Sequence, residues 1–185
     1  HWEYQPGTAP AFRVIWDQVN DQRFLAYALK VVGDDNTVYL KKPMSSSELG
    51  QSIRSAEAFL NRMEAYALSG EEGLALAELN AFRKTRVIGY TDVNLSGQTL
   101  LDEIRLERRK ELCFEGHRWF DLRRQGMPEI KHTYKAEKGG AVYEYVLQQG
   151  DPMYTLPFPN SVVLQNRALV QNPSREMGAR QGEIQ

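Results

Sequence analysis

The segment Ile104–Arg124 reads IRLERRKELCFEGHRWFDLRR and has the clearest pattern in the chain of 185 residues. Its apolar residues recur at helical spacing, and on a helical wheel they fall within about 60 degrees of Leu101. The residues of this stripe are Ile104, Leu112, Trp119 and Leu122. Gly126 and Pro128 follow as helix-ending residues. The pattern predicts one long helix over residues 100–124.

Charged residues share this apolar stripe, which is unusual for a helix on a solvated surface. Arg108 and Glu115 lie inside the stripe, and Glu111 and Arg118 lie along its edge. Buried charges are costly unless they are paired. Arg108–Glu111, Glu115–Arg118 and Arg118–Asp121 are each three residues apart, close enough to meet on a helix. We therefore expect these five residues to form a structural ladder of ion pairs.

Glu111 and Glu115 lie four residues apart and repel each other, so we also expect a cation from another segment. Candidates for this cation are Arg54, Arg83 and Arg86. Two alternatives for the ladder have less support. A catalytic pair of carboxylates needs one raised pKa, whereas adjacent arginines lower both. A helix that binds nucleic acid needs excess positive charge, whereas residues 102–124 hold seven Lys and Arg against six Asp and Glu.

Residues 51–87 predict a pair of antiparallel helices. Ile53, Ala56, Leu60, Met63 and Ala67 recur at steps of three and four residues, and the dipeptide Ser69-Gly70 ends this first helix. The second helix carries its apolar face at Ala75, Leu79 and Phe82. The spacing resembles a single tetratricopeptide-type pair. One such pair cannot bury its apolar face alone, so it needs neighbours.

The flanking regions are less regular, and we expect a mostly helical fold with short β segments. Residues 1–50 predict irregular structure with a hairpin around residues 34–36. Residues 129–185 predict an extended region with a strand at Ala141–Leu147, and residues 174–185 are polar and expected to lack regular structure. No clear domain linker stands out within residues 1–185.

Composition excludes several classes of function. A formal net charge of −1 provides no global attraction to nucleic acid. The single cysteine, Cys113, excludes a multi-cysteine metal site, and His1, His117 and His132 lack metal-ligand spacing. Motifs for nucleophilic catalysis and phosphate binding are also missing, so we expect no catalytic residues, no metal and no cofactor. No stretch approaches the roughly 20 apolar residues of a membrane-spanning helix.

Aromatic residues near the N-terminus are the candidates for ligand binding. Trp2, Tyr4 and Trp16 lie among amide and carboxylate side chains, a combination that suits stacking on sugar rings and hydrogen bonding to hydroxyls. The alternative is that these rings pack against protein, at an interface with a part of the molecule that this sequence does not contain.

Several motifs, in a fixed order, resemble the SusD/RagB-like family. The long-helix segment carries the motif IxxERxxELxxEGxRWxDLRR, and the region before the helix pair carries Asp21-x-Arg23 with Lys41 or Lys42. The pair itself resembles the family at RxAExxLxxxEAY from Arg54 and at LNxxR from Leu79. The motifs YxLPxP from Tyr154 and NxxLxQNP from Asn166 resemble its closing segment, although Ser174-Arg175 follow where the family usually has Gly-Tyr.

The resemblance covers about residues 20–173 and implies more than the sequence shows. Members of the family are mostly helical outer-membrane lipoproteins that bind oligosaccharides, or peptides in some cases, and cap a TonB-dependent transporter. The chain resembles roughly the last third of such a protein, so the lipid anchor and the N-terminal part are expected outside it. The matched Arg, Glu and Asp positions resemble scaffold and imply no ligand contact.

The main hypothesis is therefore a non-catalytic subunit that binds nutrient glycans, with the transporter and the remaining N-terminal part as partners. A protein-interaction or peptide-binding module of the same family is the second hypothesis. A glycoside hydrolase is the third, and a hydrolysis assay distinguishes it from both.

Overall fold

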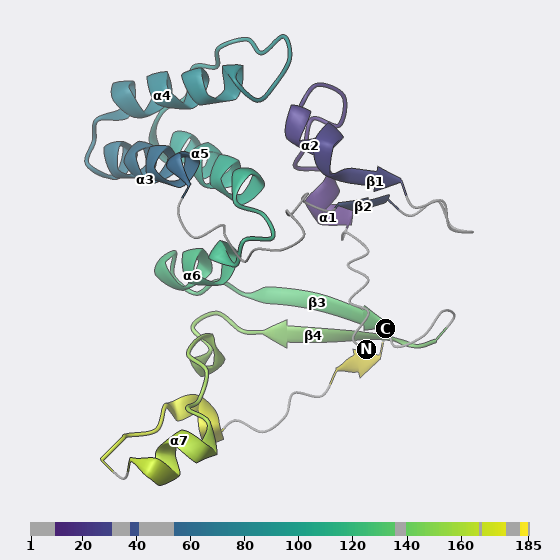
Figure 1. Ribbon diagram of the computed structural model, residues 1–185, viewed down its shortest axis with the longest axis vertical. Helices are drawn as coiled ribbons and strands as arrows, with labels where there is room; N and C mark the ends of the chain where they lie inside the picture. Colours follow the sequence, from purple (N-terminus) through teal and green to yellow (C-terminus); the bar gives the residue numbers. More distant parts are fainter. Residues whose placement is uncertain are drawn as a thin grey trace. The chain divides into compact units, whose positions relative to one another are not determined.

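The computed structural model describes residues 10–30, 38–40, 54–135, 140–166, 168–176 and 182–184. The chain divides into two compact units, residues 1–116 and residues 117–185. Figure 1 shows their helices and strands.

Three helices form the main body of the first unit: α3 (Ser55–Leu68), α4 (Glu72–Lys84) and α5 (Gly97–Glu111). The α3–α4 pair is the one that the sequence predicts, and Gly70 makes its tight turn at a φ of 85°. Helix α5 packs against both members of the pair. The core between them consists of Ala56, Leu60, Met63, Ala75, Leu79, Phe82, Leu100, Ile104 and Leu112.

Short elements precede the three helices. They are α1 (Pro10–Arg13), α2 (Gln22–Tyr27), β1 (Ala28–Lys30) and β2 (Val38–Leu40). Strands β1 and β2 pair antiparallel. The turn of the predicted hairpin lies outside the described residues. An isolated bridge pairs Asp21 with Val87, which holds the start of α2 beside the segment that follows α4.

The prediction of one helix over residues 100–124 is wrong. Helix α5 ends at Glu111, and α6 (His117–Arg124) begins six residues later, in the second unit. Between them the backbone turns through positive φ at Phe114 (64°) and Gly116 (81°). Glycine adopts this conformation readily, whereas an aromatic residue does so at a cost. Glu115 lies in this break and Arg118 in α6, so the two residues do not share one continuous helix, and their pairing stays a prediction.

The second unit contains α6 and an antiparallel sheet of order β3-β4-β5. The strands are β3 (Ile130–Lys135), β4 (Val142–Leu147) and β5 (Glu183–Ile184). Strand β4 confirms the strand predicted at Ala141–Leu147, whereas β3 was not predicted. The order of elements between β4 and β5 is a 3-10 turn η1 (Pro152–Tyr154), helix α7 (Asn160–Gln165) and a second 3-10 turn η2 (Pro173–Glu176).

Tyr154 lies at the centre of the second unit and is only 1% exposed. Its ring stacks on Trp119 with a centroid distance of 4.9 Å, and its hydroxyl donates a hydrogen bond to the Pro128 carbonyl at 2.5 Å. Ser174 is also buried and donates to the Thr155 carbonyl at 2.6 Å. The expectation that residues 174–185 lack regular structure is therefore wrong for the described part, which includes the end of η2 and strand β5.

Candidate functional site

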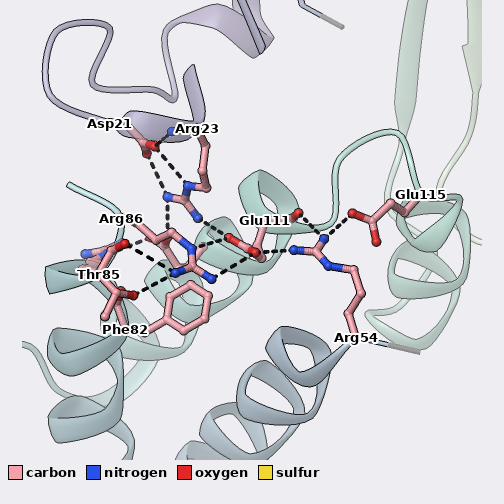
Figure 2. A network of polar contacts seen from close by, with 10 residues as sticks. Asp21, Arg23, Arg54, Phe82, Thr85, Arg86, Glu111 and Glu115 are labelled. Carbon is pink, nitrogen blue, oxygen red and sulfur yellow. Dashed lines mark hydrogen bonds and ion pairs between the residues drawn. The ribbon is translucent and has the colours of Figure 1, made fainter. Parts of the chain in front are cut away.

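The most prominent group of polar side chains is centred on Glu111, at the end of α5 (Figure 2). Glu111 is 2% exposed and meets three arginines. Its Oε2 lies 3.0 Å from both Arg23 Nη1 and Arg86 Nε, and its Oε1 lies 2.6 Å from Arg54 Nη2. The carboxylate thus joins α5 to the beginnings of α2 and α3 and to the residues after α4.

Two of these arginines were among the cations expected from the sequence, and the third expected cation, Arg83, pairs one turn earlier. Arg83 Nε lies 2.8 Å from Glu107 Oε2, and Arg83 Nη2 lies 2.6 Å from Glu103 Oε2. Arg54 also pairs with Glu115 through Nη1. The carboxylates on this side of α5 are therefore neutralised by arginines from distant segments.

Arg23 is the residue that sequence reasoning left without a role. It is 5% exposed, and its Nη2 lies 2.8 Å from Asp21 Oδ2 and 2.7 Å from Glu107 Oε1. Asp21 and Glu107 are each 1% exposed. The motif Asp21-x-Arg23 was the sequence signal that could have pointed to this residue. It marked the segment but did not show which helix Arg23 would contact.

The ionisation of these groups follows from their pairing. Burial by itself would raise the pKa of Glu111, but hydrogen bonds and charge from Arg86 and Arg23 outweigh it and lower the pKa to about 2. Burial would lower the pKa of Arg23, but Asp21 and Glu107 outweigh it and raise the value. Because Glu111 stays ionised at neutral pH, it does not suit the role of general acid, and the geometry is that of a structural ion-pair network.

The remaining ladder residues have partners in several segments. Arg108 donates from Nη1 to Asn61 Oδ1 at 2.7 Å, and its Nη2 lies 3.7 Å from Glu57 Oε1. Asp121 is buried in α6 and pairs with Arg124 at 3.0 Å. Arg118 is exposed on α6. Whether the five ladder residues act as one stabilising unit stays a prediction.

Of the three aromatic candidates for ligand binding, Trp2 and Tyr4 lie outside the described residues. Trp16 is 5% exposed and belongs to a cluster with Phe24 and Cys113. The guanidinium of Arg23 lies over the Trp16 ring, 5.5 Å from its centroid. These surroundings are those of a core residue that supports the network, and ligand contact by Trp16 stays a prediction.

A mainly apolar pocket of about 370 Å³ lies between α3 and α4. Phe59, 47% exposed, and Phe82 line it together with Arg62 and Glu78, which form an ion pair of 2.7 Å. None of the residues selected from the sequence as ligand candidates lines this pocket. Its size and lining suit an apolar side chain or a small apolar group.

Metal-ligand groups and membrane-spanning helices are absent from the described residues. In this part of the chain, no group of three His, Cys, Asp or Glu side chains is placed to hold a metal ion. The described helices are also too short or too polar to cross a membrane.

The sequence matches the model of the SusD family over residues 20–174. The chain belongs to the SusD family. The match includes the helix pair, α5, α6 and the closing segment, and with them the arginines and carboxylates of the network. No curated protein sequence matches the chain.

Solved structures of SusD-like proteins have the same fold. A SusD superfamily protein from Bacteroides fragilis is similar with a TM-score of 0.57 and 26% identity, over 81% of this chain and 34% of its own. A SusD-like carbohydrate binding protein from Bacteroides vulgatus ATCC 8482 is similar with a TM-score of 0.55 and 22% identity, over 86% of this chain and 40% of its own. The chain therefore spans well under half the length of these SusD-like proteins.

Proposed function

We propose that the protein binds nutrient glycans without cleaving them and delivers them to a TonB-dependent transporter. The match to the SusD family over residues 20–174 carries this proposal. It is supported by the name of the similar protein from Bacteroides vulgatus, which is described as carbohydrate binding. The ligand class and the transporter are inferred by analogy with the family.

The chemistry of the described acidic residues supports a role without catalysis. Hydrolysis of a glycosidic bond uses one carboxylic acid whose pKa is raised and a second carboxylate on the other side of the bond. Glu111 has a pKa lowered to about 2 and is surrounded by arginines, and Glu107 is buried between Arg23 and Arg83. Glu111 is thus ionised, and both carboxylates are paired with arginines, an arrangement that suits a scaffold.

We further propose that the intact protein is a surface-exposed lipoprotein of the bacterial outer membrane. The proposed transporter partner requires this location, because a glycan must be captured outside the cell before it is transported. Anchoring through a lipid is compatible with described helices that do not span a membrane.

An alternative function is supported by the pocket between α3 and α4. An apolar pocket with the exposed Phe59 and the Arg62–Glu78 pair at its side suits an apolar side chain of a peptide or protein better than a polyhydroxylated sugar. On this view the protein is a peptide-binding or protein-interaction member of the SusD family.

The experiment that tests the proposal is affinity electrophoresis of the protein at its natural full length, in gels that contain plant, host or microbial polysaccharides. Retardation by one glycan, with unchanged polymer length after incubation, is the expected result. Retardation by none would contradict glycan binding and favour the peptide or protein ligand. Shortening of a polymer would contradict the non-catalytic role.

A further inference from the structure

The sheet of the second unit has two faces of different chemistry. Strand pairing places His132 opposite Tyr145, and Tyr134 opposite Tyr143. Tyr143 in turn is opposite Ile184 of β5. Because opposed residues point to the same side of a sheet and alternate residues share a face, these five side chains lie on one face. We call this set the tyrosine face.

The tyrosine face contains no Lys, Arg, Asp or Glu among the described residues of the sheet. The charged residues whose side chains are described, Lys131, Glu144 and Glu183, occupy the alternate positions and therefore lie on the opposite face. This separation of charge suits a neutral ligand on the tyrosine face. When such a ligand covers the face, no charged side chain there has to lose its contact with water.

The tyrosine face is accessible. Tyr134 is 52% exposed and Ile184 is 70% exposed. His132 is also exposed, while Tyr143 and Tyr145 are partly exposed. Large aromatic surface that remains open to water is a feature of binding sites more than of ordinary protein surface.

Gly182, next to β5, allows one of the rings to lie close to the sheet. A Cβ atom at this position would stand 2.8 Å from Tyr143 Cβ and from Cε2 and Cζ of the Tyr145 ring. The ring of Tyr145 therefore occupies the space above the glycine backbone. A ring held in this way loses little further freedom when a ligand covers it.

We propose that the tyrosine face is a binding surface for the rings of a neutral saccharide. A pyranose ring presents an apolar face of C–H groups that stacks on an aromatic ring, and its hydroxyls exchange hydrogen bonds with tyrosine hydroxyls and imidazole nitrogens. Tyr134 and Tyr143 are opposed on neighbouring strands, with Cβ atoms about 4.5–5.5 Å apart, so both side chains start from adjacent positions on this face. The proposal rests on the proposed function, since it assigns the glycan to a place on the chain.

The test uses the natural full-length protein and the polysaccharide that retards it in affinity electrophoresis. The double variant Tyr134→Ala/Tyr143→Ala should bind at least about tenfold more weakly. Replacement of the same residues by Phe retains both rings and removes only the hydroxyl hydrogen bonds, so it should weaken binding less than the alanine replacement does. Thr133→Ala, on the same strand but on the opposite face, is the matched control and should leave affinity unchanged.

Each outcome has a distinct meaning. If the double alanine variant binds as tightly as the wild type, the tyrosine face is not the site, while glycan binding itself stands. If the wild type binds no glycan, both the site and the proposed function fail. Thermal unfolding checks that each variant folds. If the double variant does not fold, Tyr134→Ala alone decides, because the 52% exposed ring of Tyr134 leaves no core cavity when it is removed.

Discussion

Arg23 Nη1 and Glu111 Oε2 lie 3.0 Å apart although the two residues are 88 positions apart in the sequence. Both side chains are almost fully buried, at 5% and 2% exposure. Buried charges of opposite sign stabilise the folded state only as a complete set, because removal of one member leaves the other in a poorly solvated place. We therefore expect the stability of the first unit to depend on the carboxylate of Glu111, which several arginines share.

Replacement of Glu111 by Gln should lower the free energy of unfolding by about 3–5 kcal/mol. The neutral amide removes the negative charge that faces Arg23 Nη1 and weakens the contacts of Arg54 and Arg86, although Arg23 keeps Asp21 and Glu107 as partners. Urea unfolding, followed by circular dichroism, measures the loss. Glu78→Gln is the control, because the Arg62–Glu78 pair has side chains 51% and 23% exposed, and it should cost at most about 1 kcal/mol. Equal losses in both variants would contradict the structural role of the network.

Replacement of Arg108 by Ala should destabilise the protein by about 2–3 kcal/mol. Arg108 is 6% exposed and gives a charged hydrogen bond to Asn61, but its partner Glu57 is 28% exposed and can be solvated after the change. Lys84→Ala, which removes an exposed pair with Asp92, should change stability by less than about 0.5 kcal/mol. The same urea experiment compares the two, and a loss below about 1 kcal/mol for Arg108→Ala would mean that this side chain is effectively solvated.

Stability should depend on acid pH through Glu111. Its pKa is lowered from 4.5 to about 2 in the folded protein. A group with a lower pKa in the folded state contributes stability above its unfolded pKa and loses that contribution as the pH falls through the folded value. The difference in unfolding free energy between the wild type and Glu111→Gln should thus be constant above about pH 5 and shrink between about pH 4.5 and 2. Urea titrations of both proteins across this range measure it, and a difference that stays constant down to pH 3 would contradict the lowered pKa.

The sequence allows prediction of the elements whose signals are local. The α3–α4 pair follows from the spacing of Leu60 and Met63 and from Gly70, and β4 follows from its short apolar run. The sequence also predicts that arginines from other segments approach Glu111, because Glu111 and Glu115 are like charges four residues apart and require a counter-charge. The family motif Asp21-x-Arg23 marked the segment around Arg23, but it did not predict that Arg23 would contact Glu107 and Glu111.

What the sequence does not allow is prediction of the break between α5 and α6. Leu112 and Trp119 are seven residues apart, a spacing that fits a continuous helix as well as two helices with an irregular turn between them. Gly116 is the only residue in that turn that favours a break, while Phe114 adopts positive φ against its own preference. Local periodicity therefore does not encode this break.

Gly70 and Gly73 provide a final prediction, because they are three residues apart and differ in backbone conformation. Gly70 has a φ of 85° at the end of α3, whereas Gly73 lies inside the first turn of α4 without positive φ, and neither has an atom near the position of a Cβ. Gly70→Ala should therefore destabilise the protein by about 1 kcal/mol through backbone strain alone. Gly73→Ala should stabilise it by about 0.4–1 kcal/mol, since alanine reduces the freedom of the unfolded chain. Thermal or urea unfolding measures both, and a Gly70→Ala variant as stable as the wild type would mean that the turn between α3 and α4 does not require the left-handed conformation at Gly70.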